Sequence, residues 1–233
     1  LAPELLVREA KIREVGLPDL EDVRGEVRMR MAPNPSGPLH VGHSRMAILN
    51  DEYVKRYGGI CYNRFEDTDP ARIDPEGYDT IPRDFDWLGV KIHKTIVQSD
   101  RFDIYYDISK KLLEMGKAYI CTCRPEDWRE LKNQKKACPH REQSLSEQMS
   151  RWDKMFDGSY RPEEASLMVK TDLLHPNPAI RDFVGLRIDD TPHPRTGTKY
   201  RVYPLMNLAV AVDDHLLDLT HVLRGKDHLN NTY

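Results

Sequence analysis

The chain has 233 residues, 39% hydrophobic and 31% charged, which is enough for one large domain or for one domain that carries a second as an insertion. Its formal net charge of −3 excludes a protein that is basic throughout, so any site for a polyanion has to be a local basic patch. No apolar run approaches the ~20 residues of a membrane span and no signal peptide is visible, so we expect a cytoplasmic protein that does not enter a membrane.

The first hundred residues alternate between strand and helix patterns. In the segment 26–32, Val27, Met29 and Met31 alternate with charged residues, which is the period of a strand. The order strand, helix, strand, helix, strand predicts a parallel α/β sheet with right-handed crossovers and with ligands at the carboxyl ends of its strands. The expected elements are helices at 3–15, 41–59 and 75–90 and strands at 26–32, 60–70 with its acidic turn, and 94–100.

The pattern changes after residue 100. Helical and short β-rich segments then follow one another up to about residue 201, and we expect an inserted α+β unit at 100–201. An apolar helical run from Tyr203 and a strand at 218–225 would resume the first sheet. The chain starts at Leu1 and ends in "HLNNTY", which resembles the opening turn of a helix, so we expect a fragment.

The stretch "APNPSGPLHVGH" follows the first expected strand. Its prolines forbid continued sheet pairing, and Gly42 suits a place where a ligand or another backbone comes close. His40 and His43 fall at the start of the next helix, where free amides favour phosphate and where imidazoles can donate hydrogen bonds to phosphoryl oxygens. The alternative is a helix-capping turn with histidines on the surface.

Two motifs carry a family resemblance from about Glu26 onward. "PNPSGPLHVGH" resembles the HIGH signature of class I aminoacyl-tRNA synthetases, and together with "RFEDTDP" it is similar to the glutamyl and glutaminyl branch of the archaeal and eukaryotic kind. The resemblance implies a Rossmann-like sheet and adenylate formation, with His40 and His43 stabilising the transition state. It also implies ATP contacts by Pro33, Asn34, Pro35, Ser36, Gly42, Ser44, Arg45, Met46 and Gly225.

The resemblance also implies which residues bind the amino acid. Arg30 ends its strand where a guanidinium could hold a carboxylate, and Glu66 could accept the substrate ammonium. Arg224 stands where glutamyl enzymes have an arginine that pairs with the side-chain carboxylate, and a buried cation rejects the neutral amide. Met206 replaces a tyrosine usual in relatives, which leaves Asn207 and Val210 as alternatives for lining the site.

Asp67 and Asp69 follow Glu66 in the same acidic turn. We expect them to shape the turn rather than to touch a substrate. For Glu66 the alternative role is the same one, a solvated carboxylate that caps the next helix.

Cysteines cluster in "CTCRPEDWRELKNQKKACPH", which reads as C-x-C, fourteen residues and C-x-H. Such pairs can supply the four ligands of a structural zinc ion, and the resemblance supports this because several glutamyl synthetases carry a zinc knuckle in their acceptor-binding insertion. The alternative is reduced cysteines in a strand beside an exposed loop, and Cys61 is expected in the core. The expected ligands are Cys121, Cys123, Cys138 and His140.

Basic residues lie between and beside these cysteines. They could contact the phosphates of a tRNA acceptor stem, although charged helices are usually only solvated. The candidates are Arg129, Lys132, Lys135, Lys136 and Arg141, with Arg195 and Lys199 as a second set.

We therefore expect a monomeric glutamate–tRNA ligase that uses ATP, Mg²⁺ and structural Zn²⁺ and acts on L-glutamate and tRNA. The alternatives are a glutaminyl ligase, a small HxGH nucleotidyltransferase, and a noncatalytic tRNA-binding module built on the zinc knuckle. The expected units are the end of a helical extension at 1–25, a catalytic domain at 26–99 and 202–233, and the acceptor-binding insertion at 100–201. Without the family's KMSKS loop and anticodon domain, we expect this chain to turn over poorly.

Overall fold

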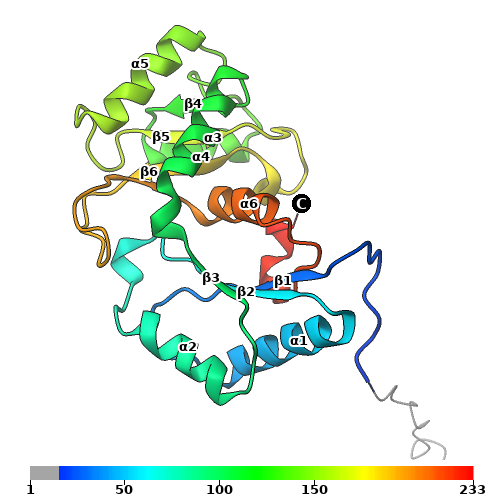
Figure 1. Ribbon diagram of the computed structural model, residues 1–233. Coiled ribbons are helices and arrows are strands. Elements are labelled where there is room, and N and C mark those ends of the chain that lie inside the picture. The colour runs from blue at the N-terminus through cyan, green and yellow to red at the C-terminus, as the bar shows by residue number, and fades with distance from the viewer. Residues whose placement is uncertain (1–15, 233) are drawn as a thin grey trace, which may run out of the picture.

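The computed structural model describes residues 16–232. The helix expected at 3–15 lies outside the described residues. Two sheets make up the described part, one parallel and one antiparallel, with the helix α6 (Met206–Leu216) between them (Figure 1).

The parallel sheet has three strands, β1 (Arg28–Met31), β2 (Ile60–Phe65) and β3 (Lys94–Val97), in the order β1-β2-β3. The helices α1 (Val41–Tyr57) and α2 (Gly77–Trp87) connect the strands, and both lie on the same face of the sheet (Figure 1). This arrangement confirms the predicted strand and helix order. It brings the carboxyl ends of β1 and β2 side by side, because Met31 pairs with Asn63 in the parallel register.

One glycine shows how tightly the first two strands meet. A Cβ atom at Gly59 would lie 2.0 Å from the carbonyl oxygen of Val27, because Ile60 begins β2 by donating to that same oxygen. Buried apolar side chains from the sheet and α1 then pack beneath the sheet, including Cys61 as expected.

The second sheet is built from residues 118–204, in the part of the chain where the sequence predicts an inserted α+β unit, and this part is called the insertion below. Its four antiparallel strands follow the order β4-β5-β6-β7, and a large apolar core lies between this sheet and its helices. The strands are β4 (Ala118–Cys121), β5 (Ser166–Val169), β6 (Phe183–Ile188) and β7 (Val202–Pro204), and the helices are α3 (Phe102–Glu114), α4 (Pro125–Asn133) and α5 (Leu145–Phe156). Short 3-10 helices occur at η2 (Pro70–Arg72), η3 (Gln98–Arg101), η4 (Pro178–Ile180) and η5 (Lys226–Asn231).

Two predicted boundaries differ from the structure. β7 pairs with β6, so the antiparallel sheet continues to Pro204 instead of ending at 201. The strand expected at 218–225 is wrong, because Thr220 and His221 both donate to the single carbonyl oxygen of Arg28 and no ladder forms. Asp218 causes this departure in part, since its positive φ of 52° turns the chain away from an extended course.

Hydrogen bonds hold helix α6 against the residues at the start of the insertion. Its Asp213 is fully buried and accepts hydrogen bonds from Gln98, Arg101 and Tyr105 at 2.8–2.9 Å. Burial is the main reason that the pKa of Tyr105 is raised, and the neighbouring Asp213 charge raises it further. The carboxylate therefore fixes α6 against the start of the insertion and sets which of its residues face the parallel sheet.

Candidate active site

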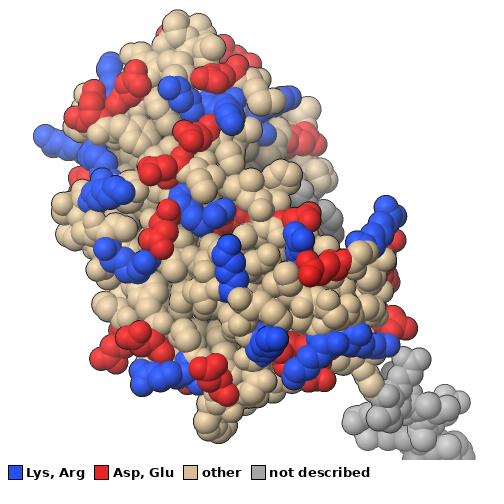
Figure 2. Space-filling model, viewed as in Figure 1, with Lys and Arg blue, Asp and Glu red and all other residues tan. Residues whose placement is uncertain are grey.

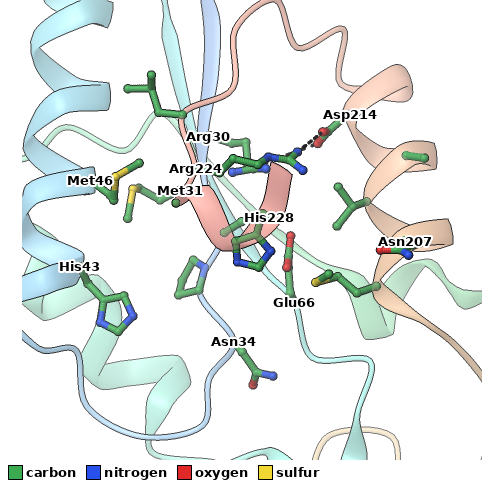
Figure 3. Close-up of a pocket in the computed structure, with 17 residues that line it drawn as sticks. Arg30, Met31, Asn34, His43, Met46, Glu66, Asn207, Asp214, Arg224 and His228 are labelled. Carbon is green, nitrogen blue, oxygen red and sulfur yellow. Dashed lines mark ion pairs between the residues drawn. The ribbon is translucent and has the colours of Figure 1, made fainter. Parts of the chain in front are cut away.

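A cavity of about 320 Å³ opens at the carboxyl ends of β1 and β2 (Figure 3). α1 lines one side, α6 lines the opposite side, and the segment that leads into η5 closes it from a third. This is where parallel α/β sheets place their ligands. Its lining residues are Arg30, Met31, Ala32, Pro33, Asn34, His43, Met46, Glu66, Met206, Asn207, Val210, Ala211, Asp214, Leu223, Arg224, Gly225 and His228.

The two histidines of the opening motif cap helix α1. The backbone N–H of Gly42 donates to Nδ1 of His40 at 3.0 Å, and the backbone N–H of His40 donates to Nδ1 of His43 at 3.2 Å. Each Nδ1 is thus an acceptor, and a neutral imidazole that accepts at Nδ1 carries its proton on Nε2. The capping turn therefore leaves each ring with an Nε2–H donor.

The two rings lie 3.9 Å apart between centroids, close to the free amides of the helix N-terminus. Burial lowers the pKa of His43, and the neighbouring His40 lowers it further, so the neutral form is favoured. A Cβ atom at Gly42 would lie 2.8 Å from the His40 ring, so the capping position of this ring is one reason for a glycine here. His43 lines the cavity, whereas His40 is exposed at its edge.

The loop between β1 and α1 is tied to the segment after β2. Pro33 accepts a hydrogen bond from the backbone of Glu66 at 3.0 Å, and Pro35 accepts one from Asp74 at 2.7 Å. Asn34 lines the cavity below the charged cluster (Figure 3), and its buried Oδ1 has no hydrogen-bond donor. The loop thus holds one unsatisfied acceptor in the cavity lining.

Five charged side chains form a cluster at the floor of the cavity. Arg64 is fully buried and pairs with Glu66 at 2.8 Å and with Asp214 at 2.5 Å. Asp214 also lies 3.7 Å from Arg30 and 3.8 Å from Arg224, the pair joined by a dashed line in Figure 3. These three guanidinium groups and two carboxylates give the cluster of five side chains one net positive charge.

Burial lowers the pKa of Arg30, and the nearby Arg64 charge lowers it further, whereas Glu66 and Asp214 oppose this effect. Burial also acts to lower the pKa of Arg64, but its ion pairs with Glu66 and Asp214 outweigh burial and raise it. The Nε atom of Arg30 is buried without a hydrogen-bond acceptor. A partly compensated buried guanidinium of this kind is suited to a carboxylate ligand.

The structure brings together most of the residues that the sequence suggested for the site. Those outside the cavity lining lie on the loop before α1 or on its first turn: Pro35, Ser36, His40, Gly42, Ser44 and Arg45. Asp67 is buried and accepts hydrogen bonds from Ser99 and Tyr78, so it shapes the turn as expected. Sequence reasoning missed Arg64, Asp214 and His228. The spacing of Asn207, Val210 and Asp214 at i, i+3 and i+7 is the signal that would have placed Asp214 on the cavity face of α6.

A second cluster joins Cys121, Cys123, Cys138 and His140. Their four potential ligand atoms lie within 4.8 Å of one another, with sulfur–sulfur distances of 3.4 Å and 3.6 Å and sulfur–Nδ1 distances of 3.3–3.8 Å. A tetrahedral zinc ion with Zn–S bonds of about 2.3 Å would hold its sulfur ligands ~3.8 Å apart. The cluster therefore fits the donor set and the size of such a site, and its cysteines are all free thiols.

The surroundings of this cluster orient its histidine. Nε2 of His140 lies 3.0 Å from Oγ1 of Thr122, which leaves Nδ1 directed at the three sulfurs. The pKa of Cys138 is lowered to about 5, chiefly because the Cys121 thiol donates to it and also because the backbone N–H of His140 does. A low thiol pKa favours the thiolate that binds metal ions.

A groove of about 660 Å³ runs from the cavity to the antiparallel sheet. It shares Asn34, Glu66 and Asn207 with the cavity and reaches Trp128 and Lys132 on α4, next to the cysteine cluster. Nζ of Lys132 lies 5.2 Å from the centre of the Trp128 ring, and Nε1 of Trp128 donates to the hydroxyl of Tyr119. The groove thus combines a fixed aromatic ring with a cation.

Two of the basic residues proposed for tRNA contact have internal partners instead. Arg141 pairs with the buried Asp182 at 2.8 Å, and Arg195 pairs with Asp100 and donates to Ser99. Both arginines hold segments of the protein together, which counts against them as free phosphate ligands. Arg129, Lys135 and Lys136 are exposed on or next to α4.

Positive and negative side chains are interspersed over the face of the molecule in Figure 2. Any binding of a polyanion therefore depends on local features such as the groove. Among residues 16–232, no helix is long and apolar enough to cross a membrane.

Comparisons with known proteins agree on one family. The family described as "tRNA synthetases class I (E and Q), catalytic domain" matches residues 26–233. The chain is 58% identical to a glutamate–tRNA ligase of Methanothermobacter marburgensis over 100% of the chain and 42% of the relative. It is 54% identical to one of Methanocaldococcus jannaschii over 97% of the chain and 40% of the relative. The chain thus spans about two fifths of the length of these curated relatives.

Solved structures share the fold. A glutamate–tRNA synthetase of Elizabethkingia anophelis superimposes with a TM-score of 0.60 at 25% identity, over 88% of this chain and 45% of that one. A glutamate tRNA ligase of Elizabethkingia meningosepticum, crystallised with its amino acid, gives a TM-score of 0.59 at 22% identity, over 89% of this chain and 45% of that one. The predicted Rossmann-like class I fold is confirmed.

Proposed function

Because this chain belongs to the class I tRNA synthetases for glutamate and glutamine, we propose that it carries the amino-acid and ATP sites of a glutamate–tRNA ligase. In the proposed reaction, the carboxylate of glutamate attacks the α-phosphate of ATP to give glutamyl adenylate and pyrophosphate. The glutamyl group then passes to the terminal ribose of tRNA, and AMP leaves.

The charge of the cavity is the observation that carries this proposal. Glutamate has two carboxylates and one ammonium group, so its net charge of −1 complements the single net positive charge of the cluster. Arg30, with its buried and unsatisfied Nε, is proposed to hold one carboxylate, and Glu66 to accept the ammonium group. Arg224, which also pairs with Asp214, is proposed to meet the side-chain carboxylate.

The same cluster favours glutamate over glutamine. The side chain of Arg224 is only 20% exposed, and a neutral amide would leave it without a second anion beyond Asp214. A site built for a buried charge rejects an uncharged isostere strongly, because the charge is left uncompensated. Met206 lines the cavity beside Asn207 and Val210, so all three are proposed to contact the amino acid.

ATP is proposed to lie over the N-terminus of α1. The Nε2–H groups of His40 and His43 and the free amides of the first turn would donate to phosphate oxygens, and Mg²⁺ would accompany the nucleotide. Negative charge shifts among these oxygens as the α-phosphate is attacked, so fixed donors stabilise the transition state. Gly225 and Asn34 line the cavity and are proposed to approach the nucleotide.

The cysteine cluster is proposed to hold a structural Zn²⁺ ion through three thiolates and Nδ1 of His140. The ion would cross-link the end of β4 to the loop after α4, and Thr122 would orient the histidine ligand. The groove beside it is proposed to receive the acceptor end of tRNA, with Lys132 near the phosphates and the ring of Trp128 near a base.

We also propose that the protein works as a monomer in the cytoplasm, where its free thiols stay reduced. A noncatalytic tRNA-binding module is disfavoured by the cavity, because such a module would have no need for partly compensated buried arginines.

The test compares ligands of known charge. Binding of glutamate, glutamine and MgATP to the chain is followed by amide NMR. Amino-acid-dependent ATP–pyrophosphate exchange is measured with and without tRNA in a chimera that continues the chain with the remainder of the Methanothermobacter marburgensis relative. We expect glutamate to shift resonances around Arg30 and Arg224 and glutamine to shift them at far higher concentration only. Exchange that depends on glutamine instead, or no exchange at all, would refute the proposal.

A further inference from the structure

Asp214 occupies an unusual position in the cavity. Its carboxylate lies within 4 Å of three guanidinium groups, those of Arg30, Arg64 and Arg224, and its side chain is 22% exposed. Glu66, the other carboxylate of the cluster, pairs with Arg64 alone among the residues that the structure describes. The placement of Asp214 therefore affects every cation of the cluster.

The contacts of the neighbouring residue fix the backbone position of Asp214. The adjacent Asp213 projects about 100° further around the helix and accepts hydrogen bonds from Gln98, Arg101 and Tyr105. The carboxylate of Asp213 thus contacts the start of the insertion, whereas the carboxylate of Asp214 lines the cavity. The carboxylate of Asp214 cannot leave the arginines by a shift of α6 without breaking the Asp213 contacts.

We propose that Asp214 is a positioning and specificity residue that sets the cavity charge for a ligand of net charge −1 and orients Arg30 and Arg224 toward separate carboxylates. This inference rests on the proposed glutamate site. Without Asp214, three arginines would face Glu66 alone, and the cluster would carry two net positive charges. Such a cavity suits a dianion better than it suits glutamate.

Two further features favour this role over a purely structural one. The contacts to Arg30 and Arg224, at 3.7 and 3.8 Å, are too long for hydrogen bonds, so Asp214 attracts these cations without occupying their donor atoms. Nε of Arg30 accordingly stays unsatisfied. Asp214 therefore holds the guanidinium groups in place and leaves their donors available to substrate.

The test compares glutamate with glutarate, which lacks the ammonium group and has a net charge of −2. Dissociation constants for both are measured by NMR titration of the chain, first as wild type and then with Asp214→Asn. We expect the affinity for glutarate relative to glutamate to rise about tenfold in the variant, because a nearby charge in a half-buried site is only partly screened. Asp214→Glu, which keeps the charge, should restore the wild-type ratio.

The matched control is Asp218→Asn. Asp218 lies two residues beyond the end of α6, is 82% exposed and pairs with Arg28 outside the cavity, so the same charge change there should leave the ratio unaltered. Thermal unfolding monitors folding, and Asp214→Ser provides a second neutral variant should Asp214→Asn not fold.

Other outcomes would overturn the inference. An equal loss of both affinities would indicate a merely structural residue, and an equal gain would indicate a carboxylate that only competes with the substrate. If the wild-type chain bound neither compound, the proposed function would fail first and this inference with it. A wild-type chain that binds glutamate with a ratio unmoved by Asp214→Asn would refute the inference alone.

Discussion

His40 has two roles that a matched pair of substitutions can separate. Its Nδ1 accepts the backbone N–H of Gly42 at 3.0 Å and caps α1, whereas its Nε2–H is proposed to donate to ATP. His40→Ala removes both functions, and the loss of the cap should lower the free energy of unfolding by about 1 kcal/mol. For a protein of this size that corresponds to a fall of about 2–4 °C in Tm. His40→Asn restores a good capping acceptor and should cost less than ~0.5 kcal/mol.

Nucleotide binding should not follow the same order. A hydrogen bond to a charged phosphate contributes about 1.5–3 kcal/mol, so both variants should bind MgATP about tenfold or more weakly than wild type. Denaturant unfolding and NMR titration with MgATP give the two quantities for each variant. If His40→Asn bound MgATP as tightly as the wild type does, the His40 ring would have no role in phosphate binding. If His40→Asn lost as much stability as His40→Ala, the ring would contribute more to stability than the helix cap.

Three further predictions concern stability. The pKa of His43 is lowered in the fold, so its contribution to stability is complete above the unfolded pKa of about 6.5 and is lost as the pH falls below that value. His43→Gln keeps a hydrogen-bond acceptor at this position but does not titrate. The Tm of this variant should therefore drop less steeply with acid than the Tm of the wild type. Chelation with EDTA should release one Zn²⁺ per chain and lower Tm. The variant Cys121→Ser should bind no stoichiometric zinc. An unchanged Tm in the metal-free protein would contradict the zinc proposal. Gly59→Ala should lower the free energy of unfolding in urea by about 3 kcal/mol, because its Cβ would clash with the Val27 carbonyl. Gly58 has a φ of 69° and open space around it, so Gly58→Ala should lower this free energy by about 1 kcal/mol only. Equal losses in the two variants would refute the steric argument.

The sequence was sufficient for the parallel sheet because its signals are local. Alternating Val27, Met29 and Met31 mark a strand, and Gly58 ends the following helix in the left-handed conformation that only glycine adopts easily. The cysteine cluster was equally accessible, since its pairs are close in sequence. The failed strand at 218–225 had the right composition, but sheet pairing depends on a partner edge, and there the chain meets only one carbonyl of Arg28.

The charge cluster could be predicted only in part. Arg30 and Glu66 stand at strand ends, where topology predicts a site. Arg64 is fully buried within β2, where it pairs with Glu66, and it resembles any alternating strand residue in the sequence. Asp214 is one of two adjacent aspartates, and only its helical spacing from Asn207 and Val210 distinguishes it from Asp213 in the sequence. Their partners could not be predicted, because the contacts of the two carboxylates span 112 to 150 residues of sequence.

Buried polar atoms without a hydrogen-bond partner occur in this cavity as well as elsewhere in the protein. Among the described residues there are eight such side-chain atoms, and three of them, Nε of Arg30, Nε of Arg64 and Oδ1 of Asn34, belong to the cavity lining or its floor. Each such group costs free energy in the folded state, and buried ion pairs are often no more stabilising than apolar side chains of the same volume. A cluster of this kind is therefore difficult to explain as a device for stability. Under the proposed function, a ligand with two carboxylates and one ammonium group would satisfy the cluster and offset this cost. The charge-selectivity experiment on Asp214 therefore tests the purpose of the whole cluster as well as the role of one member.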